Sequence, residues 1–159
     1  MNLLFVCTGN TCRSLFAEGY ARKLVNERGL KNVTVNSCGT FASSKFFIPK
    51  IVLKLLSNEG VNVSEHISTP VTRELVEKAD LIFAMEQQHV SDIVSLFPSA
   101  KNKTHLFKEY AGDNSCSYIP DPIGQTEEVY AACADEIKKC MKKIFAKLTL
   151  LKNTPTGSS

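Results

Sequence analysis

The sequence has no apolar stretch that approaches the roughly 20 residues needed to span a bilayer. It also lacks a secretory pattern at its N-terminus, where the chain enters regular structure almost at once. The net charge of +3 is too small to indicate a nucleic-acid partner. A run of lysines near the C-terminus contributes to that charge and is typical of a solvated helix face. We therefore expect a cytoplasmic protein that binds neither membrane nor nucleic acid.

Cysteine is common, but the patterns that usually give it a structural role are missing. The 6 cysteines include no Cys-x-x-Cys pair and the 3 histidines form no cluster, so a structural zinc site is not expected. The chain is too long and too aliphatic for a disulfide scaffold, and a reducing compartment keeps thiols free. Most of the cysteines are expected to be small core residues. Neither a metal nor another cofactor is expected.

Hydrophobic patterns along the chain predict alternating strands and helices. Short apolar or β-branched runs predict strands at residues 2–7, 33–38, 80–85 and 104–108. Apolar residues at helical spacing predict helices at residues 14–28, 49–59, 72–78, 90–97 and 130–148. This order predicts a single α/β domain, a Rossmann-like four-stranded parallel sheet with helices on both faces. The domain is expected to cover residues 1–151 and to act as a monomer, with a disordered tail at 152–159.

The turn after the first predicted strand, "FVCTGNTCRSL", carries the strongest chemical signal. It matches neither the dinucleotide fingerprint nor the Walker loop, because Gly9 is its only glycine. What remains is Cys-x5-Arg-Ser at a helix N-terminus, where backbone N–H groups and the helix dipole attract an anion. The same features stabilise a thiolate at Cys7, while Arg13 can hold two phosphate oxygens and Ser14 can donate to the sulfur. The alternative is a buried cysteine with an incidental surface arginine.

A candidate acid lies in "IPDPIG", after the fourth predicted strand. Breaking a phosphate ester requires a proton for the leaving group. Asp121 stands between two prolines on a rigid turn, at the same edge of the predicted sheet as Cys7. It could instead be only a turn residue or a helix cap.

Four stretches, "VCTGNTCRS", "SCGTFA", "ADLIFAME" and "DPIG", together resemble the low molecular weight protein-tyrosine-phosphatase family, in order over residues 2–148. The resemblance implies the phosphotyrosine phosphatase I fold. It also implies a phosphatase that hydrolyses protein phosphotyrosine through a thiophosphate on Cys7. Arg13 would then clamp the phosphate, Ser14 would contact the thiolate and Asp121 would be the general acid.

The resemblance also assigns supporting residues. The phosphate or another oxyanion would be bound by the loop residues Thr8, Gly9, Asn10, Thr11, Cys12 and Ser14. Asn10 would shape the loop through its side chain, with His66 bonded to it, and Cys12 could form a protective disulfide with the nucleophile on oxidation. No role is expected for His89 or His105. Leu15 replaces the usual proline. Phe46 and Phe47 are either cleft-rim aromatics or core residues, and Ile123 stands where an aromatic often follows Asp-Pro.

Other functions remain open at this point. Protein-arginine phosphatases share the loop "CTGNTCRS" and carry threonine at the position of Thr11, where tyrosine-specific relatives often have a larger aliphatic residue. Arsenate reductases need two further cysteines after the third strand, and "FAMEQQHVSDIV" contains none. A non-catalytic phosphate-binding module would be expected to lack the nucleophile or the acid. Tyrosine phosphatase is the leading interpretation and arginine phosphatase the main alternative.

Overall fold

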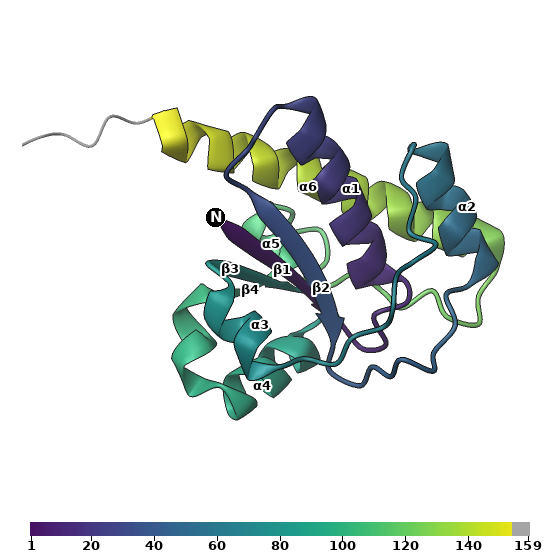
Figure 1. Ribbon diagram of the computed structural model, residues 1–159, viewed down its shortest axis with the longest axis horizontal. Coiled ribbons are helices and arrows are strands. Elements are labelled where there is room, and N and C mark those ends of the chain that lie inside the picture. Colours follow the sequence, from purple (N-terminus) through teal and green to yellow (C-terminus); the bar gives the residue numbers. More distant parts are fainter. Residues whose placement is uncertain (154–159) are drawn as a thin grey trace, which may run out of the picture.

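The computed structural model describes residues 1–153, with side chains described as far as Leu150. Its centre is a sheet of four parallel strands in the order β2-β1-β3-β4 (Figure 1). The strands are β1 (Asn2–Cys7), β2 (Thr34–Gly39), β3 (Leu81–Ala84) and β4 (Thr104–Leu106). The predicted four-stranded parallel sheet is therefore confirmed.

Helices alternate with these strands along the chain. They are α1 (Arg13–Glu27), α2 (Lys50–Asn58), α3 (Arg73–Lys78), α4 (Gln87–Leu96), α5 (Phe107–Tyr110) and α6 (Glu127–Asn153), with a 3-10 helix, η1 (Pro98–Lys103). The pattern analysis missed α5 and η1. Helix α6 continues to Asn153 and so includes the first two residues of the predicted tail, and residues 154–159 lie outside the described part. No helix in the described part is long and apolar enough to cross a membrane.

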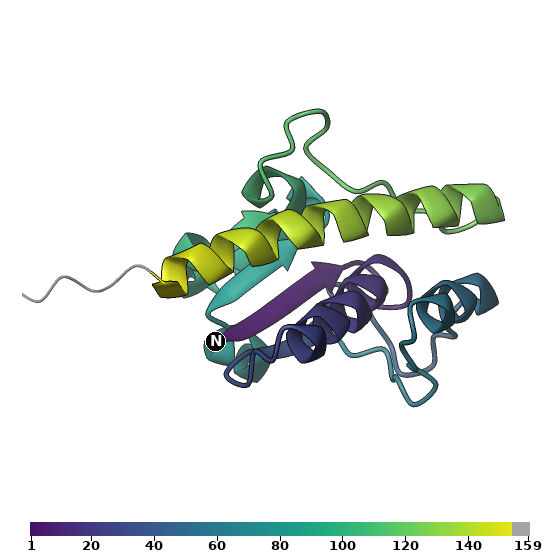
Figure 2. The same cartoon turned by 90° about the horizontal axis from the view of Figure 1, so that it is seen from above.

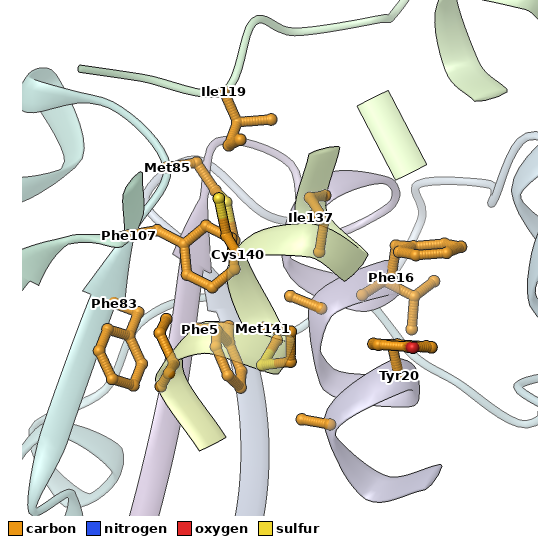
Figure 3. Close-up of a cluster of buried hydrophobic side chains, with 14 of the residues drawn as sticks. Phe5, Phe16, Tyr20, Phe83, Met85, Phe107, Ile119, Ile137, Cys140 and Met141 are labelled. Atoms are coloured by element: carbon orange, nitrogen blue, oxygen red, sulfur yellow. The ribbon is translucent and has the colours of Figure 1, made fainter. Parts of the chain in front are cut away.

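Both faces of the sheet are covered, because side chains of a strand point alternately to its two sides. On one face, Phe5, Phe83 and Phe107 pack with residues of α1 and α6, among them Phe16 and Ile137 (Figure 3). Helix α6 runs along the length of this layer (Figure 2). On the other face, Leu4, Val6 and Ile82 pack against residues from α3 and α4. This two-sided burial explains why β1 has a continuous apolar sequence.

The topology leaves an opening at the carboxyl end of β1. Strands β1 and β3 are neighbours, and the chain leaves β1 toward β2 but leaves β3 toward β4, so the connections after these two strands run in opposite directions. Ligands of open α/β sheets bind at such a switch point. The segment that begins there is the loop after Cys7.

Candidate active site

The loop between β1 and α1 folds around the sulfur of Cys7. The Cys7 Sγ lies 2.9 Å from Ser14 Oγ. It also accepts a hydrogen bond of 3.3 Å from the backbone N of Asn10. Described side chains make no capping hydrogen bond at Cys12, the N-cap of α1. The first amides of this helix are therefore available to an anion.

Asn10 holds the loop in shape. Its backbone lies in the left-handed region, at φ 56°, a conformation that asparagine tolerates better than most residues. Its Nδ2 donates to Ser14 Oγ at 2.9 Å and to Ser37 Oγ at 2.8 Å, and its Oδ1 accepts from the backbone N of Thr69 at 2.9 Å. The backbone carbonyl accepts from His66 Nε2 at 2.9 Å. The expected contacts of Asn10, including that with His66, are present.

These contacts determine which atom donates to the cysteine. Ser37 donates its own proton to the carboxylate of Glu18 and accepts from Asn10. Ser14 also accepts from Asn10, so its hydroxyl proton is left to point at Cys7 Sγ. The loop thus presents a sulfur with two hydrogen-bond donors directed at it.

Arg13 lies beside the same loop, with only 2% of its side chain exposed. Its Nη1 donates to Glu86 Oε1 and, at 2.9 Å, to the carbonyl of Ile119. Its Nη2 lies 3.4 Å from Asp121 Oδ2, so the structure brings together Arg13 and Asp121 as the sequence predicted. The Asp121 side chain is 40% exposed, and its Oδ1 accepts from the backbone N of Ile123 at 3.1 Å. Sequence reasoning did not identify Glu86.

Gly39, at the end of β2, lies directly against the loop. A Cβ built on it would stand 2.3 Å from the carbonyl oxygen of Thr8 and 3.0 Å from the backbone N of Asn10. Only a residue without a side chain allows this approach. "SCGTFA" carried the signal for this glycine, but its role becomes visible only in three dimensions.

Comparison with known proteins places this geometry in a family. Residues 2–154 match the family model described as low molecular weight phosphotyrosine protein phosphatase. The chain belongs to this family. It is 36% identical over 148 residues to the protein-arginine-phosphatase of Bacillus subtilis, covering 93% of this chain and 97% of that protein. It is 31% identical over 129 residues to the low molecular weight protein-tyrosine-phosphatase Etp of Escherichia coli, covering 81% of this chain and 82% of that protein.

A solved structure agrees with the family assignment. The YwlE arginine phosphatase from Geobacillus stearothermophilus superposes with a TM-score of 0.87 at 31% identity, over 99% of each chain. The predicted phosphotyrosine phosphatase type of α/β fold is therefore confirmed. The protein is a phosphatase of the low molecular weight family, whose catalysis is based on a cysteine.

Two exposed aromatic side chains, Phe41 and Phe46, lie near the loop of the phosphatase site. Phe46 is 41% exposed and Phe47 94% exposed, so neither belongs to the core. Phe46 Cδ2 stands 3.8 Å from the place that a Cβ on Gly9 would take. Phe41, 75% exposed, has its ring centroid 6.4 Å from that of Phe46 and was missed by sequence reasoning. Ile123 is 53% exposed beyond Asp121.

Two further groups of this phosphatase lie close to the loop. Burial raises the pKa of the Cys12 thiol to about 11, so this cysteine is a neutral thiol at pH 7. His89, for which no role was expected, is 2% exposed and its Nε2 lies 2.8 Å from Thr8 Oγ1. Sequence reasoning missed this contact, because only the fold brings the start of α4 against the loop that follows Cys7. Residues 1–153 contain no group of three or more metal-ligating side chains.

Proposed function

We propose that Cys7 is the nucleophile of this phosphatase and that its sulfur attacks the phosphorus of a phosphorylated protein side chain. The S–P bond forms as the bond from phosphorus to the leaving group breaks, and Asp121 gives that leaving group its proton. Water then attacks the thiophosphate, the S–P bond breaks, and the Asp121 carboxylate takes the water proton. The pair of donors directed at Cys7 Sγ, from Ser14 and Asn10, carries this proposal.

Arg13 is arranged to hold the transferred phosphoryl group. Both hydrogens of its Nη1 are engaged, by Glu86 and by Ile119. Nε and Nη2 remain as the parallel pair of donors that a phosphate can accept from in bidentate fashion. Because Nη2 also lies beside Asp121, the arginine places the phosphate next to the acid.

For the substrate, we propose protein phosphoarginine as the preferred residue, with phosphotyrosine as the second candidate. Thr11 supports this choice, because it is 5% exposed within the loop and offers a small, partly polar wall where a larger aliphatic side chain would grip a phenyl ring. The relative that is 36% identical is named a protein-arginine-phosphatase, and the one that is 31% identical a protein-tyrosine-phosphatase. Family membership and the exposed aromatic side chains near the loop keep phosphotyrosine as the alternative.

The test is a comparison of kcat/KM on matched peptides that carry phosphoarginine or phosphotyrosine at the same position. Thr11→Ile should shift the ratio toward phosphotyrosine by at least about tenfold, because one or two buried methylenes are worth roughly 10- to 200-fold in such a pocket. Thr34→Ile is the matched control, since Thr34 is exposed at the opposite end of the sheet. An unchanged ratio in Thr11→Ile would remove the support that this residue gives to phosphoarginine.

A further inference from the structure

His89 makes hydrogen bonds to the phosphate site from both nitrogens of its ring. It lies in the first turn of α4, where its Nδ1 accepts a 3.1 Å hydrogen bond from the backbone N of Glu86. In return, the Glu86 side chain accepts from the backbone N of His89, which completes a capping box. On the other side of the ring, Nε2 lies 2.8 Å from Thr8 Oγ1. The ring therefore joins the N-cap of α4 to the residue that follows Cys7.

These contacts fix the tautomer of His89. A backbone N–H only donates, so Nδ1 must be unprotonated, and the proton of the neutral ring lies on Nε2 and is donated to Thr8. The charge state agrees: burial lowers the pKa of His89, and the positive charge of Arg13 lowers it further. The carboxylates that face the ring and act in the opposite direction are Glu86, Asp92 and Asp121.

The hydrogen bond at Nδ1 connects His89, through Glu86, to the guanidinium of Arg13. The Glu86 carboxylate that caps α4 also binds Nη1 of Arg13. Rotation of Glu86 away from the helix end would release that nitrogen, while the cap keeps the carboxylate in place. The hydrogen bond at Nε2 connects His89 to the loop, because its partner Thr8 directly follows Cys7 in the chain.

We propose that His89 is a positioning residue of the phosphate site, which holds Glu86 against Arg13 and anchors Thr8, so that the sulfur and the guanidinium keep their relative positions. The proposal rests on the proposed function of the loop but is the same for either phosphorylated residue. A simpler role, as a cap that stabilises α4 alone, would affect stability without changing phosphate binding.

Two substitutions each keep one of these hydrogen bonds and remove the other. In His89→Asn, the Oδ1 atom can take the place of Nδ1 and accept from Glu86 N, but the side chain is too short to reach Thr8. In His89→Gln, the Nε2 atom can take the place of the ring Nε2 and donate to Thr8, but Glu86 N loses its acceptor. Measured below the melting temperature of every variant, His89→Gln should weaken competitive inhibition by inorganic phosphate about tenfold, because Arg13 loses its fixed partner Glu86. His89→Asn, which keeps the contact with Glu86, should bind phosphate nearly as tightly as the parent but have a lower kcat, because Thr8 beside Cys7 is no longer anchored. His89→Ala should lose both phosphate affinity and kcat.

Two further readouts test the route through Glu86. In a Glu86→Gln background, adding His89→Gln should produce little further loss of phosphate affinity, because both changes act on the same contact with Arg13. The ratio of phosphate inhibition constants, parent over His89→Asn, should be constant at and above pH 7. It should rise only in acid, below the ordinary histidine pKa of about 6.5, because burial lowers the pKa of His89. Protonated His89 would carry an Nδ1–H that faces the Glu86 N–H, so the hydrogen bond between them would be lost. The amide of asparagine does not titrate. All other titrating groups are present in both proteins and therefore cancel in the ratio.

The outcomes are distinguishable. Equal phosphate inhibition and equal kcat in the parent, His89→Asn and His89→Gln, with only the melting temperature lowered, would overturn the positioning role. If His89→Ala does not fold, the Asn and Gln pair still decides. Failure of the proposed function would instead show in the parent, as binding of phosphate without hydrolysis of phosphopeptides, and the binding constants of the variants would still test His89.

Discussion

Gly39→Ala should disable the phosphatase by displacing the phosphate loop with a single methyl group. The added Cβ would stand 2.3 Å from the Thr8 carbonyl oxygen and 2.9 Å from Ala42 Cβ. An unstrained carbon–oxygen contact is about 3.3 Å, so the Thr8 carbonyl must move by roughly 1 Å. A misplacement of about 1 Å can cost roughly 10²-fold in rate, and overpacking typically costs about 1–3 kcal/mol of stability. We therefore expect kcat/KM on an aryl phosphate to fall about 10²-fold in a protein that still folds.

The assay for Gly39→Ala pairs initial rates with denaturant unfolding, and Gly19→Ala on α1 is the control. A Cβ on Gly19 meets Leu56 Cδ2 at 2.9 Å and Val61 Cγ1 at 3.1 Å, which are methyl ends of side chains that can rotate away. The control adds the same atom without moving backbone and should keep the kcat/KM of the parent. If Gly39→Ala keeps it as well while losing stability, the claim that this contact sets the loop geometry is refuted.

Three predictions concern the chemistry itself. Cys7→Ser should abolish turnover but still bind phosphate or vanadate, because Arg13 and the loop amides remain; turnover within about tenfold of the parent would exclude the sulfur nucleophile. Asp121→Asn should lower the rate by about 10²- to 10⁴-fold, and less with a leaving group that needs no proton. Equal losses on good and poor leaving groups would indicate a structural turn. Peroxide should inactivate the enzyme reversibly, as the sulfenic acid of Cys7 condenses with the Cys12 thiol to a disulfide and water. Thiol should then fail to restore Cys12→Ser, and full recovery of that variant would contradict the protective role.

The sheet and most helices were predictable because their signal is local. Residues 3–7 are buried on both sides of the sheet, and a continuous apolar run is the direct consequence. By contrast, η1 is a 3-10 helix, whose side chains do not follow the 3.6-residue period, and α5 has only four residues, about one turn. The predicted fourth strand accordingly ran on into Phe107 and Lys108, which begin α5. Lys108 is buried there with 1% of its side chain exposed, and its partner Glu136 comes from α6.

The candidate site likewise contains some residues that the sequence revealed and others that it did not. Cys7, Arg13 and Ser14 could be found because the turn itself contains them. Glu86 and His89 could not, because their contacts with Arg13 and Thr8 join residues that are 73 and 81 positions apart. Nothing in "AMEQQHV" indicates which carboxylate will face an arginine, or that a histidine will be neutral and buried. Such partners become visible only once β1 and β3 are placed side by side.

Asn10 is held by residues far along the chain, and this determines when an active molecule can form during synthesis. The complete signature of the nucleophile leaves the ribosome within the first 14 residues. However, the positive φ of Asn10 is a conformation that few non-glycine residues adopt, and the partners that hold it, Ser37 and Thr69, follow 27 and 59 residues later. The carbonyl of Ile119, which orients Arg13, follows 106 residues after that arginine. A nascent chain therefore carries the proposed nucleophile, Cys7, long before it can carry the assembled site, so the appearance of activity reports completion of the domain.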